Sequence, residues 1–360
     1  MSGAEPAAGT RVERAQSKLS DLGADVLLIH GAANRRYLSG FTGSAGVLLV
    51  GAEHRVLVTD FRYTVQARDQ APAFTIVETA EPLEGLADAV AASGATRVGF
   101  EPEHVTYAGF QKLEARLAEL TTPARLVPVE SVVEQLRVIK DAGEVAVMRE
   151  AVRIADEVMA RAAAWIEPGV TERALANRLE AAMRDLGAEG PAFDTIVAAG
   201  PNAAMAHHQP GSHPIAEGEP VIVDLGARLG GYCSDITRTF IAGPADKTFR
   251  RIYDLVLEAQ LAAEAEIRAG MSGRAADALA RDPIAAAGHG GDFGHGTGHG
   301  VGLEIHESPR LSTRSDDTLA TGMVTSVEPG IYLPGWGGVR IEDLVLVQDD
   351  GVEVLTQAAK

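Results

Sequence analysis

The chain has 360 residues, of which 46% are hydrophobic and 23% charged, and its formal net charge is −18. The length predicts two domains of ordinary size, and no apolar run approaches the roughly 20 residues of a membrane helix. The excess of carboxylates argues against nucleic acid as a partner. The single cysteine, Cys233, excludes an intrachain disulfide framework. We expect residues 1–10, which lack a signal-peptide core, to form a frayed tail, and we predict a cytoplasmic protein that does not enter a membrane.

The first third of the chain alternates short apolar runs with helical patterns, which is typical of an α/β domain. It contains no metal-like cluster, and we interpret its charged residues Arg35, Arg36, Asp60 and Arg62 as solvated surface charge. An alanine-rich helical stretch begins near Asp141. We therefore predict domains over 1–135 and 136–360. The elements predicted for the first domain are helices over 11–22, 84–92 and 107–120 and strands over 26–29, 46–50, 55–59 and 97–100.

The second domain contains two sequence matches at nearly the same offset. Residues 166–174 resemble 267–275, an offset of 101 residues. A glycine lies six residues before Asp224 and another lies six residues before Glu328, an offset of 104 residues. Two such matches predict a duplicated helix–strand unit. Because both carboxylates end apolar strands, a pseudo-twofold axis between the copies would bring them face to face.

Asp224 and Asp235 occupy two neighbouring predicted strands. A two-residue turn at Leu229-Gly230 would place the two aspartates directly opposite each other, with Cβ atoms about 5 Å apart. Carboxylates that close repel each other unless a cation lies between them. The alternative is a pair of exposed aspartates that never meet, and the strongly apolar strand before Asp224 disfavours it.

The same pattern recurs at Glu328 and Glu342, which flank a turn centred on Gly335. Residues 294–307 lie between the two carboxylate pairs in the sequence and contain five glycines and three histidines. Four carboxylates and one imidazole make a mixed oxygen and nitrogen site that suits Mn²⁺, Co²⁺ or Zn²⁺, and carboxylates can bridge two ions.

Other uses of the glycine-rich stretch fit less well. The dinucleotide fingerprint needs Gly-x-Gly-x-x-Gly directly after a strand, and neither the spacing nor the strand is present. A phosphate loop needs Gly-Lys-Ser/Thr, which is absent, as is His-Glu-x-x-His.

Together these motifs resemble the signatures of the pita-bread metallopeptidases, and most closely the aminopeptidase P and prolidase branch, which cleaves Xaa–Pro bonds. The resemblance covers nearly the whole chain after residue 10. It implies an α/β (α+β) protein with a creatinase-like N-terminal domain and a pita-bread catalytic domain that has an internal pseudo-twofold repeat. The segments that carry it are 36–44, 58–63, Asp224, 234–239, 294–302, 327–330 and 339–343.

Position by position, the resemblance implies that five side chains hold two divalent metal ions, namely Asp224, Asp235, His299, Glu328 and Glu342. Asp235 and Glu342 would bridge both ions, Asp224 would complete one, and His299 with Glu328 would complete the other. The further site residues that it implies are His207, His306 and Glu328 for catalysis and His295 and Arg340 for substrate contact. The adjacent His208 leaves open which of the two neighbouring histidines faces the site.

The implied activity is that of an Xaa–Pro aminopeptidase acting on peptides of three or more residues. Glu328 would be the general base, and His306 with His207 would stabilise the oxyanion. A prolidase restricted to dipeptides is the alternative. A creatinase-like hydrolase without metals and a non-catalytic binding protein are disfavoured, because all five ligand types are present. We expect Mn²⁺ as the metal, with Co²⁺ or Zn²⁺ as substitutes, a proline-containing peptide as substrate, and a homodimer.

Overall fold

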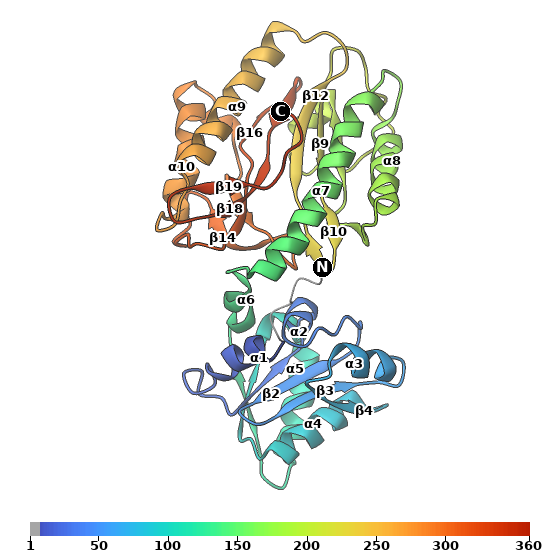
Figure 1. The fold of residues 1–360 in the computed structure, drawn as a ribbon, viewed down its shortest axis with the longest axis vertical. Helices are drawn as coiled ribbons and strands as arrows, with labels where there is room; N and C mark the ends of the chain where they lie inside the picture. The colour runs from blue at the N-terminus through green and yellow to red at the C-terminus, as the bar shows by residue number, and fades with distance from the viewer. Residues whose placement is uncertain (1–7) are drawn as a thin grey trace. The chain divides into compact units, whose positions relative to one another are not determined.

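The computed structural model describes residues 8–360, which divide after Arg137 into two compact units (Figure 1). Residues 1–7, part of the predicted tail, lie outside the described residues. Among the helices of residues 8–360, none combines the length and the apolar character that crossing a membrane requires.

The first unit is built on a six-stranded mixed sheet with the strand order β4-β3-β2-β1-β5-β6. The central strand β1 is buried along its whole length, and α4 packs against α5 on one face through Leu86, Val90, Leu113 and Leu117. The predicted strands and helices are confirmed to within a few residues, except for the first helix, which runs from Ala8 to Gln16 instead of over 11–22. Residues 8–10, predicted as part of the tail, therefore belong to this helix. The strands are β1 (Val26–Ile29), β2 (Val47–Gly51), β3 (Arg55–Thr59), β4 (Thr75–Glu78), β5 (Arg97–Phe100) and β6 (Arg125–Pro128). The helices are α1 (Ala8–Gln16), α2 (Ala32–Ser39), α3 (Thr64–Gln70), α4 (Pro82–Ser93), α5 (Tyr107–Ala118) and α6 (Val132–Arg137).

Arg35 is not a surface charge, so this prediction is wrong. Its side chain is buried and donates hydrogen bonds to the carbonyl oxygens of Gly43 (2.7 Å), Gly46 (2.8 Å) and His30 (3.2 Å). Buried carbonyls at the ends of strands need donors that water cannot supply, and the guanidinium provides them. Asp60 and Arg62 form a local ion pair at 2.8 Å in which Arg62 is exposed, as expected for surface charge.

The second unit consists of two similar halves with helices outside and strands between them (Figure 1). The helices of each half pack on the sheet of that half through a separate hydrophobic core. The first half contains α7 (Ala142–Trp165), α8 (Glu172–Asp185), β7 (Gly190–Pro191), β8 (Ile196–Ala199), β9 (Pro220–Leu225), β10 (Ala227–Leu229), β11 (Tyr232–Cys233) and β12 (Ile236–Ile241). The second half contains α9 (Lys247–Glu266), α10 (Gly273–Ala286), β13 (Gly298–Gly300), β14 (Glu307–Leu311), β15 (Val324–Val327), β16 (Gly330–Leu333), β17 (Gly337–Arg340), β18 (Asp343–Val347) and β19 (Val352–Val354).

The predicted duplication is visible in matching local structure. The hydroxyl of Thr171 caps α8 by accepting from the Ala174 amide at 3.2 Å, and the hydroxyl of Ser272 caps α10 by accepting from the Ala275 amide at the same distance. Each capping residue also forms an isolated β-bridge to a segment further along the chain. The two halves therefore start their second helix in the same way.

The turn between β10 and β11 differs from the predicted one. Leu229 pairs with Tyr232, so the turn residues are Gly230 and Gly231, which have φ values of 54° and 78°. A type I′ hairpin turn needs positive φ at both central residues, which glycine adopts freely and leucine does not. The predicted Leu229-Gly230 turn is therefore wrong by one position.

This shift changes how the two aspartates meet. Asp224 pairs with Thr237 rather than with Asp235, which lies two residues before Thr237. The aspartates are thus diagonal neighbours on one face rather than directly opposed. In the second half the predicted register is confirmed, since Leu333 pairs with Gly337 and Val327 with Asp343. That register sets Glu328 opposite Glu342.

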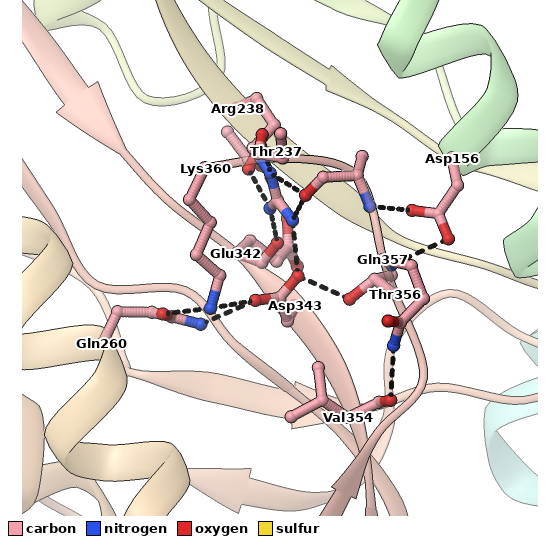
Figure 2. A network of polar contacts seen from close by, with 12 residues as sticks. Asp156, Thr237, Arg238, Gln260, Glu342, Asp343, Val354, Thr356, Gln357 and Lys360 are labelled. Carbon is pink, nitrogen blue, oxygen red and sulfur yellow. Dashed lines mark hydrogen bonds and ion pairs between the residues drawn. The ribbon is translucent and has the colours of Figure 1, made fainter.

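A buried polar network joins the two halves behind these carboxylates (Figure 2). Its centre is Arg238, whose Nη1 donates to the carbonyl oxygens of Thr237 (2.9 Å) and Glu342 (2.5 Å) and whose Nη2 donates to Asp343 Oδ1 (2.7 Å). Asp343 also pairs with Lys360 at 2.6 Å. Buried charges are tolerated only when they are paired and hydrogen-bonded, so the network fixes β12 and β18 side by side next to Glu342.

Glu264 of α9 extends this network and makes it sensitive to pH. It pairs with Lys360 at 3.0 Å, and burial and the nearby Asp343 charge raise the pKa of Glu264 from 4.5 to about 7. The folded chain therefore binds more protons at Glu264 than the unfolded chain between these values, and its contribution to stability falls as pH rises through them. We expect the free energy of unfolding of the wild type, minus that of Glu264→Gln, to decrease between pH 4.5 and pH 8.

The measurement is denaturant unfolding followed by tryptophan fluorescence, because Trp165 and Trp336 both lie in the second unit. Glu150→Gln is the control, since the hydrogen bond from Arg153 lowers the pKa of Glu150 and the trend should be absent or reversed. A difference for Glu264→Gln that stays constant with pH would contradict the prediction.

Candidate metal centre

The five predicted metal ligands come from both halves of the second unit. Asp224 lies in β9, Asp235 precedes β12, His299 lies in β13, Glu328 follows β15 and Glu342 precedes β18. Single ligand atoms of Asp235, His299 and Glu342 lie within 4.8 Å of one another. His299 Nε2 is 3.3 Å from Glu328 Oε1 and 3.7 Å from Asp235 Oδ2. The fold therefore brings the predicted ligands into one cluster.

A single pocket of about 440 Å³ opens onto this cluster. The five carboxylate and histidine residues line it, and so do the four further side chains predicted for catalysis and substrate contact, His207, His295, His306 and Arg340. Residues that are more than 130 positions apart in the sequence thus face one cavity.

The chemistry of the cluster fits divalent cations. Burial, followed by the charges of neighbouring carboxylates, raises the pKa values of Asp235 and Glu342 well above their ordinary values. Asp224 Oδ1 is buried and has no hydrogen-bond partner among the described residues. Carboxylates in this state are costly unless a cation neutralises them. The mixed oxygen and nitrogen donor set is one that divalent metal ions prefer.

His299 is oriented for ligation by its second ring nitrogen. Nδ1 lies 3.1 Å from the Gly300 carbonyl oxygen and donates to it, which leaves Nε2 facing the carboxylates. Burial alone would raise the pKa of Glu328, but the hydrogen bond and positive charge of His299 lower it to about 2. The His299 ring and the Glu328 carboxylate therefore lie side by side in the cluster.

Two hydroxyl groups donate hydrogen bonds to the carboxylates of Glu342 and Glu328. Thr237 Oγ1 donates to Glu342 Oε2 at 2.6 Å, and Ser326 Oγ donates to Glu328 Oε1 at 3.1 Å. Such outer partners fix the rotamer of a ligating carboxylate. The Thr237 contact crosses from the first half to the second, so the first half orients a candidate ligand of the second.

Both adjacent histidines line the pocket, but they differ in their contacts and exposure. His208 Nε2 donates to the buried carboxylate of Glu172 at 2.8 Å, whereas His207 is exposed at the pocket. The His306 ring lies 4.4 Å from the His299 ring, centroid to centroid. This arrangement favours His207 as the histidine that faces a substrate.

Tyr332 is a site residue that the sequence analysis missed. Its hydroxyl accepts from Arg340 Nη1 at 2.8 Å and lies 2.7 Å from His295 Nε2, while Arg340 Nη2 donates to Asp224 Oδ2 at 2.7 Å. Burial raises the pKa of Tyr332 to about 12, so the phenol stays protonated. Strand alternation could have identified it, since Tyr332 lies four residues after Glu328 and on the same face.

A second group of possible ligands, Glu101, His104 and Glu134, meets in the first unit. The sequence analysis did not predict it. Both oxygens of Glu101 are already engaged, because Oε2 accepts from the His30 and Gly31 amides and Oε1 from the Asn34 side chain. These bonds satisfy the carboxylate without a cation, so the group is a structural network.

Comparisons with known proteins agree with this geometry. Metallopeptidase family M24 matches residues 146–349, and the creatinase/prolidase N-terminal domain matches residues 11–139. The chain is 43% identical to the Xaa-Pro dipeptidase from Bacillus anthracis, with a TM-score of 0.95 over 98% of both chains. It is 36% identical to the X-Pro aminopeptidase from Thermotoga maritima, with a TM-score of 0.89 over 97% of this chain and 98% of that one. It is also 35% identical to the Xaa-Pro dipeptidase of Pyrococcus horikoshii over 93% of each chain. The predicted fold and family are confirmed.

The cluster predicts how metal content responds to substitution. Asp235→Asn removes a central carboxylate, so we expect the dialysed protein to retain less than half of the wild-type content of divalent metal, as measured by elemental analysis. Asp194→Asn is the matched control, because Asp194 lines the same pocket but is exposed and lies outside the cluster. Equal metal content in wild type and Asp235→Asn would rule out Asp235 as a ligand.

Proposed function

Because the chain belongs to metallopeptidase family M24 and is therefore a hydrolase, we propose that it cleaves the bond between an N-terminal residue and a following proline. The observation that carries the proposal is the single pocket in which the buried carboxylate–histidine cluster meets His207, His295, His306 and Arg340. The similarity over nearly the whole chain to proteins named Xaa-Pro dipeptidase and X-Pro aminopeptidase supports proline as the second residue.

The five ligands would hold two divalent metal ions, which supply a water of lowered pKa and an electrophile for the carbonyl oxygen. Glu328, at the edge of the cluster, accepts a proton from the attacking water. His306 and His207 donate hydrogen bonds to the carbonyl oxygen as it gains negative charge. Arg340 holds Asp224 and Tyr332 in place, and Tyr332 in turn orients His295.

Proline fits the pocket for a steric reason. The bond before proline is a tertiary amide that has no N–H group to be recognised and carries a rigid ring on its nitrogen. Phe193, Ile196 and Ile305 line the pocket beside the polar side chains. Apolar walls of this kind accept a ring and demand no hydrogen bond from it.

The length of the substrate is the point at which the proposal departs from the sequence analysis, which favoured peptides of three or more residues. Arg310 lines the pocket, is exposed there and forms no ion pair within residues 8–360. Its charge, after burial and the charge of His299, lowers the pKa of His306. An arginine in this position offers a charged partner for the free carboxylate of a dipeptide, so we propose a preference for Xaa–Pro dipeptides.

Three further points belong to the proposal. Mn²⁺ is the proposed metal, on the ground of the oxygen-rich ligand set. A cytoplasmic location is consistent with Cys233, the single cysteine, which is buried and unpaired. We also propose the homodimer that the family resemblance implies, and light scattering of the active protein tests it.

The first test compares an Xaa–Pro dipeptide, the same dipeptide with an amidated C-terminus, and the tripeptide. With the Mn²⁺-loaded wild type we expect the free dipeptide to be hydrolysed fastest. Arg310→Gln should lower kcat/KM for the free dipeptide roughly 10- to 100-fold, because a charge-assisted hydrogen bond is lost, and should leave the amide nearly unchanged.

Arg274→Gln is the control for a lost surface arginine, because Arg274 pairs with Asp316 in an exposed position. Faster cleavage of the tripeptide, with release of the first residue, would reverse the length preference in favour of an aminopeptidase. A wild type that cleaves none of the three peptides would refute the proposed function.

A further inference from the structure

We propose that Glu172 is a positioning residue for the reaction, which fixes the pocket segment 199–211 and through it sets the place of His207. The inference rests on the function proposed above, since it takes His207 as a group that contacts the substrate. It assigns a role to a buried carboxylate that belongs neither to the metal cluster nor to the pocket wall.

Glu172 is the first residue of α8 and its side chain is fully buried. Oε1 accepts from the Ala199 amide (2.9 Å) and from Asn202 Nδ2 (3.0 Å). Oε2 accepts from His208 Nε2 (2.8 Å) and from the Gly211 amide (3.0 Å). One carboxylate therefore ties down the start, the middle and the end of the segment.

The segment needs such an anchor because it lacks regular structure of its own. It consists of a short 3₁₀ turn, Gly200–Ala204, followed by residues 205–211, which belong to no helix or strand. Hydrogen bonds to an ionised carboxylate are about twice as strong as neutral ones. The position at the N-terminus of α8 also favours the negative charge of Glu172.

The anchor acts on the two neighbouring histidines differently. The ring of His208 is held on Glu172, while the adjacent His207 is exposed at the pocket. Ala206, the residue before His207, is bound by a different side chain, since Arg340 Nη1 donates to its carbonyl oxygen at 3.3 Å. His207 thus lies between one contact that leads to Arg340 beside the metal cluster and one that leads to Glu172.

The second half of the unit has a comparable arrangement. Asp277 of α10 accepts from the amide (3.0 Å) and the hydroxyl (2.9 Å) of Thr297. Asp277 also holds Arg281 at 2.6 Å, and Arg281 donates to the carbonyl oxygens of Phe293 (2.9 Å) and His295 (2.6 Å). In each half, a buried carboxylate on the second helix ties down the segment that carries a pocket histidine.

A purely structural Glu172 would behave differently from a positioning one. If the carboxylate only supported the start of α8, its loss would change stability, and its effect on rate would be independent of His207. If it positions His207, its effect on rate should disappear once the imidazole is absent. A double-mutant cycle separates these cases, because residues that act through each other are not additive.

The experiment uses metal-loaded wild type, Glu172→Gln, His207→Ala and the double variant, with an Xaa–Pro dipeptide as substrate. Glutamine keeps an acceptor for Ala199 and Asn202 but presents an amide donor to His208 and Gly211. We expect Glu172→Gln to lower kcat/KM roughly 10- to 100-fold, mainly in kcat, as for a misplaced catalytic group. The double variant should lie within about threefold of His207→Ala. Rate effects that multiply would overturn the proposal.

Glu134→Gln is the matched control, because Glu134 forms a carboxylate–histidine pair with His104 at 3.7 Å in the first unit and lines neither the pocket nor the segment 199–211. It should change kcat/KM by less than about threefold. His208→Gln removes one of the four bonds and should give a smaller loss than Glu172→Gln, which keeps the test open if the latter variant folds poorly. Because His208 also lines the pocket, this loss supports the anchor only if the amides of 199–211 exchange faster as well. A His208→Gln variant with wild-type kcat would count against the anchor.

Hydrogen exchange of the backbone amides gives a readout that does not depend on activity. In Glu172→Gln, the Gly211 amide and its neighbours in 199–211 should exchange at least tenfold faster than in the wild type, while amides of α10 stay unchanged. A wild type that is inactive on Xaa–Pro peptides would refute the proposed function alone. Unchanged exchange in 199–211 would refute the anchor alone.

Discussion

The second unit depends on the close burial of carboxylates and a histidine where its two halves meet. Burial removes the water that would screen Asp235 and Glu342, and neighbouring carboxylates add repulsion, so their pKa values rise well above normal. Oriented hydrogen-bond donors offset part of this cost. Arg340 donates to Asp224, Thr237 to Glu342 and Ser326 to Glu328. One oxygen of Asp224 is left for a cation.

The duplication explains how one chain can hold this cluster rigidly. Each half supplies candidate ligands from its own sheet, and the isolated pairing of Thr237 with Glu342 joins the two sheets next to one of them. Arg238 then fixes the same two strands from behind through their carbonyl oxygens (Figure 2). A candidate ligand set built from two halves that are hydrogen-bonded to each other is preorganised, which is what a metal site requires of its protein.

Local sequence patterns predicted the strand register of the site where glycine determined the conformation of the turn. The Gly335 turn set the register of Glu328 and Glu342 correctly, whereas the first hairpin was shifted because two adjacent glycines, Gly230 and Gly231, take the turn positions. The buried, hydrogen-bonded positions of Arg35 and Glu172 could not be predicted from local patterns. The partners of Arg35 are backbone carbonyls, and two of the four partners of Glu172 are backbone amides, up to 39 residues away, which no side-chain pattern marks.

The pocket is lined by both carboxylates and arginines, and this bears on which peptides it accepts. The ligand cluster is rich in carboxylates, while Arg310 lines the same cavity and has no ion-pair partner within residues 8–360. A dipeptide is itself a short zwitterion, with an ammonium group and a carboxylate separated by one peptide bond. The protein has a net charge of −18, so the positive charge of an arginine without an ion-pair partner contrasts with the acidic character of the chain. Under the proposed function the substrate carboxylate would give it a partner, and a longer peptide would place a neutral amide there instead.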